Sequence, residues 1–275
     1  MTATLPPLSQ AFRDRYLIER EIGRGGMATV YLAHDVRQRE PVAIKIMHRD
    51  LSATLDTERF RREMEIAASL SHPSIVPLLE SGDAGEVPYY SMPYIEGGSL
   101  HQRLDRERQL SLEEAFRITH DVAEALGYAH GLGILHRDVK PGNILLTEPR
   151  ALVADFGLAR ALGVANYRKL TDTGIMVGTL FYTSPEQLLG ERELDQRADI
   201  YSLGCLLYEM LTGEPPYAGA LAHQVVTRIF RTPVPSARRL RATVPETVDE
   251  ALGRALAKSA AERFTSMAEF AAALP

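Results

Sequence analysis

Short apolar runs separated by glycine or charged residues characterise the first part of the chain. They span residues 16–22, 29–36 and 41–47, and they are rich in β-branched and aromatic side chains. Two further runs of this kind cover residues 75–81 and 87–95. The pattern predicts that strands dominate the chain up to about residue 95.

One helix is predicted within this strand-rich part, over residues 57–70. Phe60, Met64 and Ala67 recur at the spacing of a single helix face. Pro73 disfavours the helical backbone at the residue before it, so we expect the helix to have ended by His72.

Helical patterns replace strand patterns after Gly97 and Gly98. Ser111 and Glu114 have the spacing of a capping box, in which the serine accepts from a first-turn N–H and the glutamate reaches back. They precede a long amphipathic helix. Further helices are predicted over residues 198–212, 247–257 and 266–274. This segregation predicts a small sheet and a larger helical body that meet near residues 93–98.

The composition is that of a globular protein. The 275 residues are 45% hydrophobic and 24% charged, which excludes a disordered or collagen-like chain, and the length suits one large domain or two lobes. The net charge of −5 gives no attraction to phosphate polymers, so we expect no nucleic-acid partner.

Cellular location is constrained by what the sequence lacks. Cys205 is the single cysteine, so no internal disulfide can form, as is usual in a reducing compartment. No apolar run approaches the roughly 18 residues that span a bilayer, and the first residues lack the apolar stretch of a signal peptide. We therefore expect a cytoplasmic segment that makes no membrane contact.

Residues 22–30 contain a Gly-x-Gly core between two predicted strands. Glycine lets backbone N–H groups approach phosphates with no Cβ in the way. A tight hairpin turn would explain the motif equally well. In a dinucleotide-binding fold a helix must follow the glycines, whereas a strand-like run follows here. We therefore favour a flexible hairpin that covers a nucleotide.

Lys45 is the single charge in the apolar run 42–46. It either lies on the solvent face of a strand or donates to phosphates under the glycine hairpin, in which case an acidic partner should orient it. Glu63 is the candidate partner, since it shares a helix face with the apolar residues. Glu65 lies about 200° around the helix from Glu63.

A dense polar segment, residues 136–143, is followed twelve residues later by Asp155. Asn143 and Asp155 offer the amide and carboxylate oxygens that Mg²⁺ prefers. Asp138 could accept a hydroxyl proton, and Lys140 could stabilise charge on a transferred phosphoryl group. Polar capping of a turn could explain any one of these residues, but not the whole ordered set.

These motifs together resemble the signature of eukaryotic-type protein kinases, and the resemblance covers residues 16–275. In chain order they are the glycine loop, VAIK at 42–45, HRDVKPGN at 136–143, DFG at 155–157, SPE at 184–186, DIYSLG at 199–204 and Arg263. Three phrases are similar to the kinase domains of bacterial receptor-like serine/threonine kinases: GRGGMATVYLA, RFRREMEIAASLSHPSIV and VGTLFYTSPEQ.

The resemblance implies a bilobal α+β fold. It consists of an N-terminal antiparallel sheet with one regulatory helix, followed by a mainly helical C-terminal lobe. We expect a flexible leader over residues 1–15, the N-lobe over 16–95 and the C-lobe over 96–275. The implied reaction transfers the γ-phosphoryl group of ATP to Ser and Thr hydroxyls of protein substrates, with Mg²⁺, which Mn²⁺ can replace.

The resemblance also implies the role of individual residues. Asp138 is the expected catalytic base, Lys140 marks a serine/threonine kinase, and Lys45 and Glu63 form the phosphate-orienting pair. Asn143 and Asp155 are the expected metal ligands. The expected ATP-binding residues are Ile22, Gly23, Gly25, Val30, Ala43, Lys45, Met92 as gatekeeper, Pro93 and Ile95 of the hinge, and Leu145.

Control is expected in the activation segment between Asp155 and Glu186. The resemblance implies autophosphorylation at Thr171 and Thr173, whose phosphates would pair with Arg137. A solvated loop with incidental threonines is the alternative. Residues expected on the substrate shelf are Arg137, Thr179 beside Asp138 and Lys140, and Glu186 in a buried ion pair with Arg263.

The departures from the kinase pattern spare every catalytic position. Ala28 replaces the third glycine and Ser184 replaces the alanine of the APE motif. A pseudokinase is therefore disfavoured, and a small-molecule phosphotransferase is disfavoured by the shelf at 179–186. We expect a transient or back-to-back homodimer. The native protein could be a membrane-anchored receptor kinase, with this chain as its intracellular domain.

Overall fold

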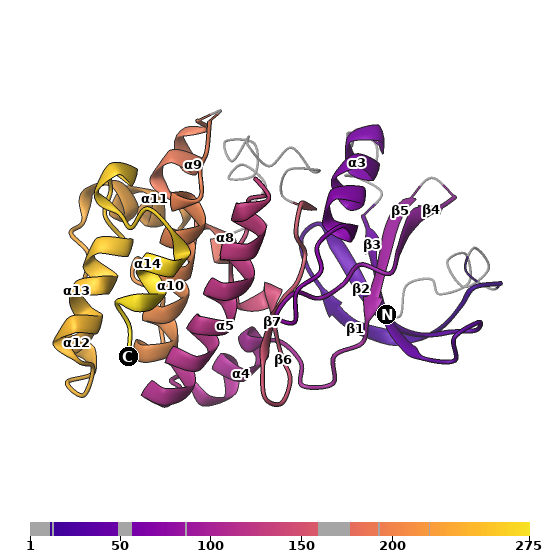
Figure 1. Cartoon of the computed structure of the whole chain (residues 1–275), viewed down its shortest axis with the longest axis horizontal. Helices are drawn as coiled ribbons and strands as arrows, with labels where there is room; N and C mark the ends of the chain where they lie inside the picture. Colours follow the sequence, from indigo (N-terminus) through magenta and orange to yellow (C-terminus); the bar gives the residue numbers. More distant parts are fainter. Residues whose placement is uncertain are drawn as a thin grey trace. The chain divides into compact units, whose positions relative to one another are not determined.

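The computed structural model describes Phe12 and residues 14–48, 57–85, 87–158, 177–191, 193–219 and 221–275. The chain divides into two compact units (Figure 1). The first unit takes its described residues from Met1–Ser71 and Val76–Ile95, and the second from His72–Ile75 and Glu96–Pro275.

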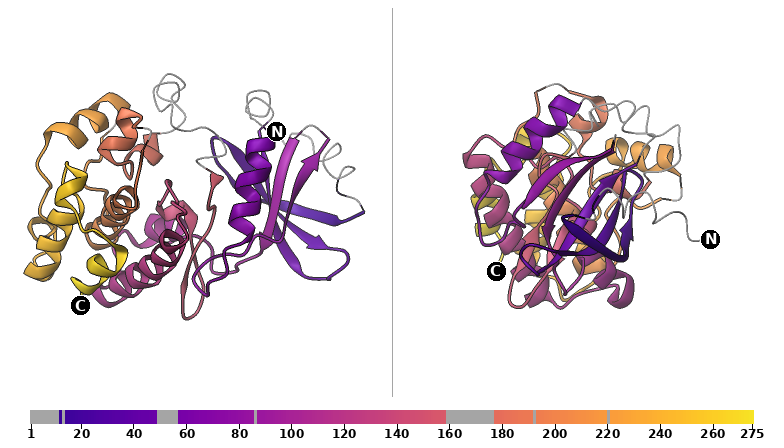
Figure 2. Two further views of the ribbon diagram at one scale, coloured as in Figure 1. Left: turned by 45° about the horizontal axis from the view of Figure 1, so that its top comes forward. Right: turned by 90° about the vertical axis from the view of Figure 1, so that its right-hand side faces the viewer.

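The first unit is built on a five-stranded antiparallel sheet with strand order β1-β2-β3-β5-β4. The helix α3 (Thr57–Ala68) lies beside this sheet (Figures 1 and 2). The strands are β1 (Tyr16–Arg24), β2 (Ala28–Asp35), β3 (Pro41–Met47), β4 (Glu80–Ala84) and β5 (Val87–Pro93).

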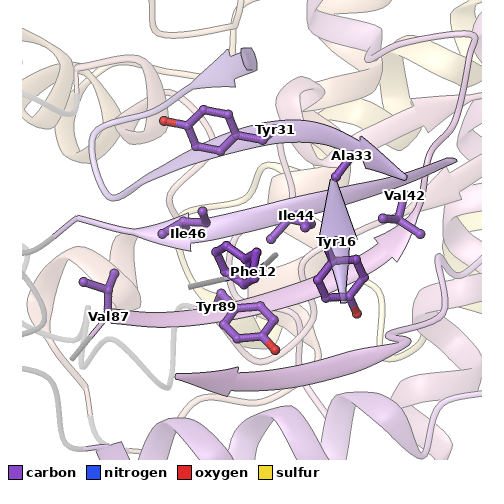
Figure 3. Close-up of a cluster of buried hydrophobic side chains, with 9 residues drawn as sticks. All are labelled: Phe12, Tyr16, Tyr31, Ala33, Val42, Ile44, Ile46, Val87 and Tyr89. Carbon is purple, nitrogen blue, oxygen red and sulfur yellow. The ribbon is translucent and has the colours of Figure 1, made fainter. Parts of the chain in front are cut away.

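One face of the sheet carries the hydrophobic core of the first unit (Figure 3). Side chains alternate between the faces of a strand, so cross-strand partners share a face. The register pairs Tyr31 with Ile44 and Ala33 with Val42, and all four residues are buried in this cluster. The rest of the cluster is Phe12, Tyr16, Ile46, Val87 and Tyr89.

The packed unit begins before Tyr16, which corrects the boundary expected for the flexible leader. Phe12 is buried, and its ring meets that of Tyr89 edge-on with 4.7 Å between centroids. The guanidinium of Arg15 contacts Asp35 at 2.8 Å and Glu80 at 3.0 Å. The sequence of residues 1–15 did not predict these contacts, because a single aromatic residue and a single arginine form no periodic pattern.

The strand predicted over residues 75–81 is largely wrong. Ile75 forms only an isolated bridge with Val153, and β4 begins at Glu80 with a polar sequence. Ile75 and Val76 are buried although they lie outside a regular strand. The apolar run therefore reflects burial of an irregular segment, which periodicity cannot distinguish from a strand.

α3 confirms the predicted helix and its inward face. Phe60, Glu63, Met64 and Ala67 are its buried residues. Glu65 is exposed, as expected for a residue on the opposite side of the helix.

The second unit is mainly helical and is organised around α10 (Arg197–Thr212), which is buried along almost its whole length. It packs against α5 (Leu112–Gly131) and α13 (Glu246–Ala255), and α5 also packs against α14 (Met267–Ala272). Cys205 is buried within α10, as expected for a small apolar side chain. The remaining helices are α4 (Leu100–Glu107), η1 (Pro141–Asn143), α8 (Val177–Leu180), α9 (Pro185–Leu189), α11 (Ala222–Arg231), α12 (Ala237–Leu240) and η2 (Ala260–Glu262).

The predicted capping box of α5 is only half formed. Ser111 accepts from the backbone N–H of Glu114 at 3.1 Å, as expected. The carboxylate of Glu114 instead accepts from Arg103 of α4 at 3.3 Å. A charged partner on a neighbouring helix therefore takes the place of the reciprocal backbone bond.

A two-stranded hairpin, β6 (Ile144–Leu146) and β7 (Ala151–Val153), completes the second unit. The chain approaches this hairpin closely at Gly97, where an added Cβ would overlap the carbonyl oxygen of Leu146. Gly98 then accepts from the backbone N–H of Leu146 at 2.9 Å. No helix in the described residues is long and apolar enough to cross a membrane.

Candidate active site

Four of the predicted ATP-binding residues share one face of the sheet in the first unit. The register pairs Val30 with Lys45 and Ala43 with Met92. Because neighbouring positions of a strand face opposite sides, these residues lie opposite the core cluster that contains Ile44. The strand pattern thus gathers an aliphatic surface around a single lysine, as a nucleotide base next to phosphates would require.

The glycine-rich segment forms the hairpin between β1 and β2. Ile22 and Gly23 belong to β1, and the N–H of Gly25 donates to the carbonyl of Ala28 at 2.9 Å to close the tip. The strand predicted after the glycines is confirmed, which separates this motif from a dinucleotide-binding turn followed by a helix.

Lys45 and Glu63 both belong to the first unit. Lys45 lies in β3, and Glu63 is buried on α3 with 5% of its surface exposed. A buried carboxylate is stable only when a cation or hydrogen-bond donors compensate it. Pro93 ends β5 opposite Val42, and Ile95 is the last residue of this unit.

The polar segment 136–143 gathers its side chains around Asp138 in the second unit. The ammonium of Lys140 donates to the Asp138 carboxylate at 2.7 Å and to the hydroxyl of Thr179 at 3.2 Å. Asn143 donates its amide Nδ2 to the same carboxylate at 3.1 Å and to the Asp138 carbonyl at 2.8 Å. Four predicted site residues are therefore brought together, and one of them, Thr179, lies far along the chain from the other three.

Asp199, at the start of α10, holds the backbone of this segment. Its buried carboxylate accepts from the N–H of His136 at 2.9 Å and from that of Arg137 at 2.8 Å. A third contact comes from Nε2 of His130 at 2.8 Å. Burial raises the pKa of Asp199, but these donors outweigh burial and hold it below its ordinary value.

His136 anchors the loop and is not placed to act as a base. Its Nδ1 accepts from the N–H of Asp138 at 3.2 Å, so Nε2 carries the hydrogen that it donates to the carbonyl of Ala154 at 2.9 Å. Its ring also meets Phe156 edge-on, 4.6 Å away. Both ring nitrogens are therefore committed to the fold.

The β6–β7 hairpin brings the two predicted metal ligands together. Asn143 precedes β6, Asp155 lies two residues after the end of β7, and the N–H of Ala154 donates to the carbonyl of Asn143 at 2.9 Å. Asp155 has φ +69°, a strained value for a residue other than glycine. Because Asn143 uses Nδ2 toward Asp138, its Oδ1 is the atom suited to a cation, and the donor set fits Mg²⁺.

The described residues contain no group of three or more His, Cys, Asp or Glu side chains that could hold a metal ion. Leu145, the remaining predicted ATP-binding residue, lies in β6 of the second unit.

The predicted ion pair between Glu186 and Arg263 is confirmed. The guanidinium donates two bonds, of 2.6 and 2.8 Å, to the carboxylate, and the Arg263 side chain is fully buried. Arg263 also donates to the carbonyl of Arg197 at the start of α10. The bidentate geometry fixes α9 against the helical core of this unit.

Sequence reasoning missed three residues that support the site. His130 belongs to no motif, and the DIYSLG motif gives Asp199 no role by itself, because their contacts cross long stretches of chain. Gln187 had a readable signal, because Ser184-x-x-Gln187 has capping-box spacing and the box forms. The side chain of Gln187 also donates to the carbonyl of Arg137 at 2.9 Å, at a residue with φ +68°. Thr171 and Thr173 lie outside the described residues.

Comparison with known proteins identifies the family. The protein kinase domain model matches residues 16–273. The chain is 42% identical to the serine/threonine-protein kinase PknB of Mycolicibacterium smegmatis over 96% of its length, and 40% identical to that of Mycobacterium leprae over 98%. It is 39% identical to the Mycobacterium tuberculosis protein over 95%.

The chain spans less than half the length of these relatives, 42–44% of each. The expected fold and enzyme class are confirmed, since the match covers both units and every motif from the glycine hairpin to Arg263. The chain belongs to the protein kinase family and is a serine/threonine protein kinase domain similar to bacterial PknB.

Proposed function

We propose that Asp138 is the catalytic base in transfer of the γ-phosphoryl group of ATP to a Ser or Thr hydroxyl of a protein substrate. The observation that carries this assignment is the pair of donors at its carboxylate, Lys140 and Asn143, of which Lys140 also donates to Thr179. Two donors orient Oδ2, and an oriented carboxylate can accept the proton of an incoming hydroxyl.

Lys140 is the residue that stabilises the negative charge on the transferred phosphoryl group. Its ammonium lies between Asp138 and Thr179, so it is held at the position where the acceptor hydroxyl would meet Asp138. A fixed cation at that point costs no reorganisation during the reaction.

ATP is bound by the face of the first sheet that carries Val30, Ala43, Lys45 and Met92. Ile22, Gly23 and Gly25 cover the phosphates, and Pro93 and Ile95 offer backbone groups to adenine. Burial of Glu63 on α3 supports its pairing with Lys45, because a buried carboxylate requires a compensating charge.

Asn143 and Asp155 are the residues that would hold Mg²⁺ or Mn²⁺. The bound ion neutralises charge on the phosphate oxygens. The β6–β7 hairpin and the strained backbone of Asp155 support the assignment, because strain of this kind persists where the surrounding fold imposes it.

The test of the base is Asp138→Asn. We expect kcat to fall by about 10²–10⁴-fold while the Kd for ATP, measured by calorimetry, changes less than about twofold. Asp105→Asn, at an exposed position of α4, is the matched control and should keep full turnover. Wild-type turnover in Asp138→Asn would reject the assignment.

Autophosphorylation at Thr171 and Thr173 is the proposed control of activity, with Arg137 as the residue that receives a phosphate. Each phosphate adds about −1.5 to −2 charge, which a guanidinium can bind with two hydrogen bonds. Mass spectrometry after incubation with ATP and Mg²⁺ should find phosphate at both threonines. A phosphate-free Thr171→Ala/Thr173→Ala variant should be several-fold slower, and equal rates would contradict the proposal.

We also propose that this domain acts in the cytoplasm, where ATP is available, as the intracellular part of a longer receptor-like kinase. The resemblance to PknB over less than half of that protein's length supports it. Fractionation of cells that express the native protein tests the idea. Recovery in the membrane fraction, with the kinase domain digested only after permeabilisation, is the expected result, and recovery in the soluble fraction would contradict it.

A further inference from the structure

The two strands of the glycine hairpin, β1 and β2, differ in how regularly they pair with their neighbours in the sheet. β1 is an edge strand, and its pairing with β2 is irregular between Glu21 and Gly23, next to the glycines. The pairing of β2 with β3 is regular from Ala28 to His34. The position of the hairpin tip is therefore set mainly from the β3 side.

His48 extends that regular pairing beyond the end of β3. Its backbone N–H donates to the carbonyl of Met27, in the hairpin tip, at 2.9 Å. Its ring Nε2 lies 3.1 Å from the hydroxyl of Thr29, near the start of β2. Two contacts from one residue thus bracket the point where the hairpin leaves the sheet.

The contact with Thr29 has energetic consequences because this threonine is buried, with 5% of its surface exposed. A buried hydroxyl that loses its partner pays the full cost of desolvation. The ring of His48 is the side-chain partner that satisfies it, and the bond resists any movement that lifts β2 away from β3.

His48 lies on the face opposite the proposed nucleotide-binding surface. The register pairs Thr29 with Ile46, a member of the core cluster, whereas Val30 pairs with Lys45 on the other face. His48 follows Ile46 by two positions and contacts Thr29, which places it on the core side. It can therefore influence the nucleotide only through the position of the hairpin backbone.

We propose that His48 is a positioning residue for the glycine hairpin. Through its contacts with Thr29 and Met27, His48 sets the height of the hairpin tip over the phosphates of ATP. The inference rests on the proposed nucleotide site in the first unit. It adds a residue that no kinase motif of the chain contains and that contacts no part of the substrate.

The test is a double-mutant cycle of His48→Ala and Thr29→Val, read as steady-state kinetics at varied ATP. We expect each single variant to raise KM for ATP about three- to tenfold with kcat changed less than twofold. The double variant should be no worse than the more affected single variant, because both remove the same bond. His48→Gln, whose amide can donate or accept, should recover at least half of the loss.

His34→Ala is the matched control, since His34 lies exposed on the same strand pair and away from the hairpin tip. Hydrogen exchange of the peptide covering residues 21–30 should accelerate in His48→Ala and not in the control. Unchanged KM, additive losses in the cycle, or equal effects in His34→Ala would each overturn the proposal. Lys45→Met tests the nucleotide site separately, because its turnover should be lost whether or not His48 positions the hairpin.

Discussion

At the scale of single residues, one carboxylic acid outside the catalytic cluster, Glu209, has a pKa well above its ordinary value. Glu209 is largely buried in α10, where it accepts from the hydroxyl of Tyr182 at 2.5 Å. Burial raises its pKa from 4.5 to about 7, the bond from Tyr182 opposes the rise, and the charge of Asp105 adds to it. Tyr182 lies three residues after Thr179, so the acid adjoins the substrate shelf.

Glu209 should make stability depend on pH across the neutral range. Between pH 4.5 and about 7 the folded chain binds more protons at this site than the unfolded chain, so the free energy of unfolding falls as pH rises. The shift corresponds to a loss of at most about 3 kcal/mol. Glu209→Gln should remove this loss. The free energy of unfolding of the variant minus that of the wild type should therefore be larger at pH 8 than at pH 5.

Urea denaturation at pH 5, 6, 7 and 8 measures this difference. Glu246→Gln, at an exposed position of α13, is the control and should follow the wild-type curve. Parallel curves for wild type and Glu209→Gln would show that this carboxyl titrates normally in the folded chain.

At the scale of elements, the close approach of Gly97 to β6 excludes a side chain at position 97, just after the hinge segment. A Cβ at Gly97 would overlap the carbonyl oxygen of Leu146, a backbone atom that cannot rotate away. Gly97→Ala should therefore cost about 1–3 kcal/mol of stability, as overpacking does elsewhere. The hydrogen bond from Leu146 to the carbonyl of Gly98 should break with it.

Gly253→Ala should instead stabilise the folded chain. Gly253 lies within α13, and an added Cβ there would meet no heavy atom within 4 Å. Alanine in a helix interior is favoured over glycine by about 0.5–1 kcal/mol. Thermal unfolding of both variants is the measurement, and a stabilised Gly97→Ala would show that the chain can yield at this point.

The elements also show what the sequence could and could not predict. Periodicity found α3, α5 and α10, because each buries one face or its whole surface. It failed for residues 75–81, where burial comes from an irregular segment. Phe12 was missed for a related reason, since one buried aromatic before a strand has no repeating partner.

The candidate site was more predictable from sequence than its supports. Asp138, Lys140 and Asn143 lie within six residues, so their proximity follows from local chain geometry. The contacts of Asp199 with the backbone of His136 and Arg137 join residues more than sixty positions apart. Such contacts depend on how α10 packs, which short motifs do not encode.

At the scale of the whole molecule, exposed apolar side chains on the first unit offer a candidate surface for self-association. Leu17, Val36 and Leu79 are 56%, 46% and 46% exposed. Val36 and Leu79 lie next to the ion-pair partners of Arg15, since Val36 follows Asp35 and Leu79 precedes Glu80, and the N–H of Val36 donates to the carbonyl of Arg15 at 3.0 Å. Leu17 is two residues after Arg15 in β1. We propose that the expected back-to-back homodimer forms through this surface.

Charge substitution on that surface should separate dimerisation from catalysis. Leu17→Glu/Leu79→Glu should weaken self-association at least tenfold in sedimentation equilibrium, because each carboxylate would be desolvated in an apolar contact. Phosphorylation of a peptide by already activated enzyme should be unchanged. The initial rate of autophosphorylation should fall and should depend more steeply on protein concentration, since encounter between copies becomes limiting.

Leu240→Glu is the matched control, because Leu240 is even more exposed, at 63%, but belongs to the second unit. It should self-associate and autophosphorylate as the wild type does. If Leu240→Glu weakens the dimer as much as the double variant does, the contact is not specific to the first unit. If neither variant changes self-association, the surface around Arg15 is not the dimer interface, and activation between copies must use another face.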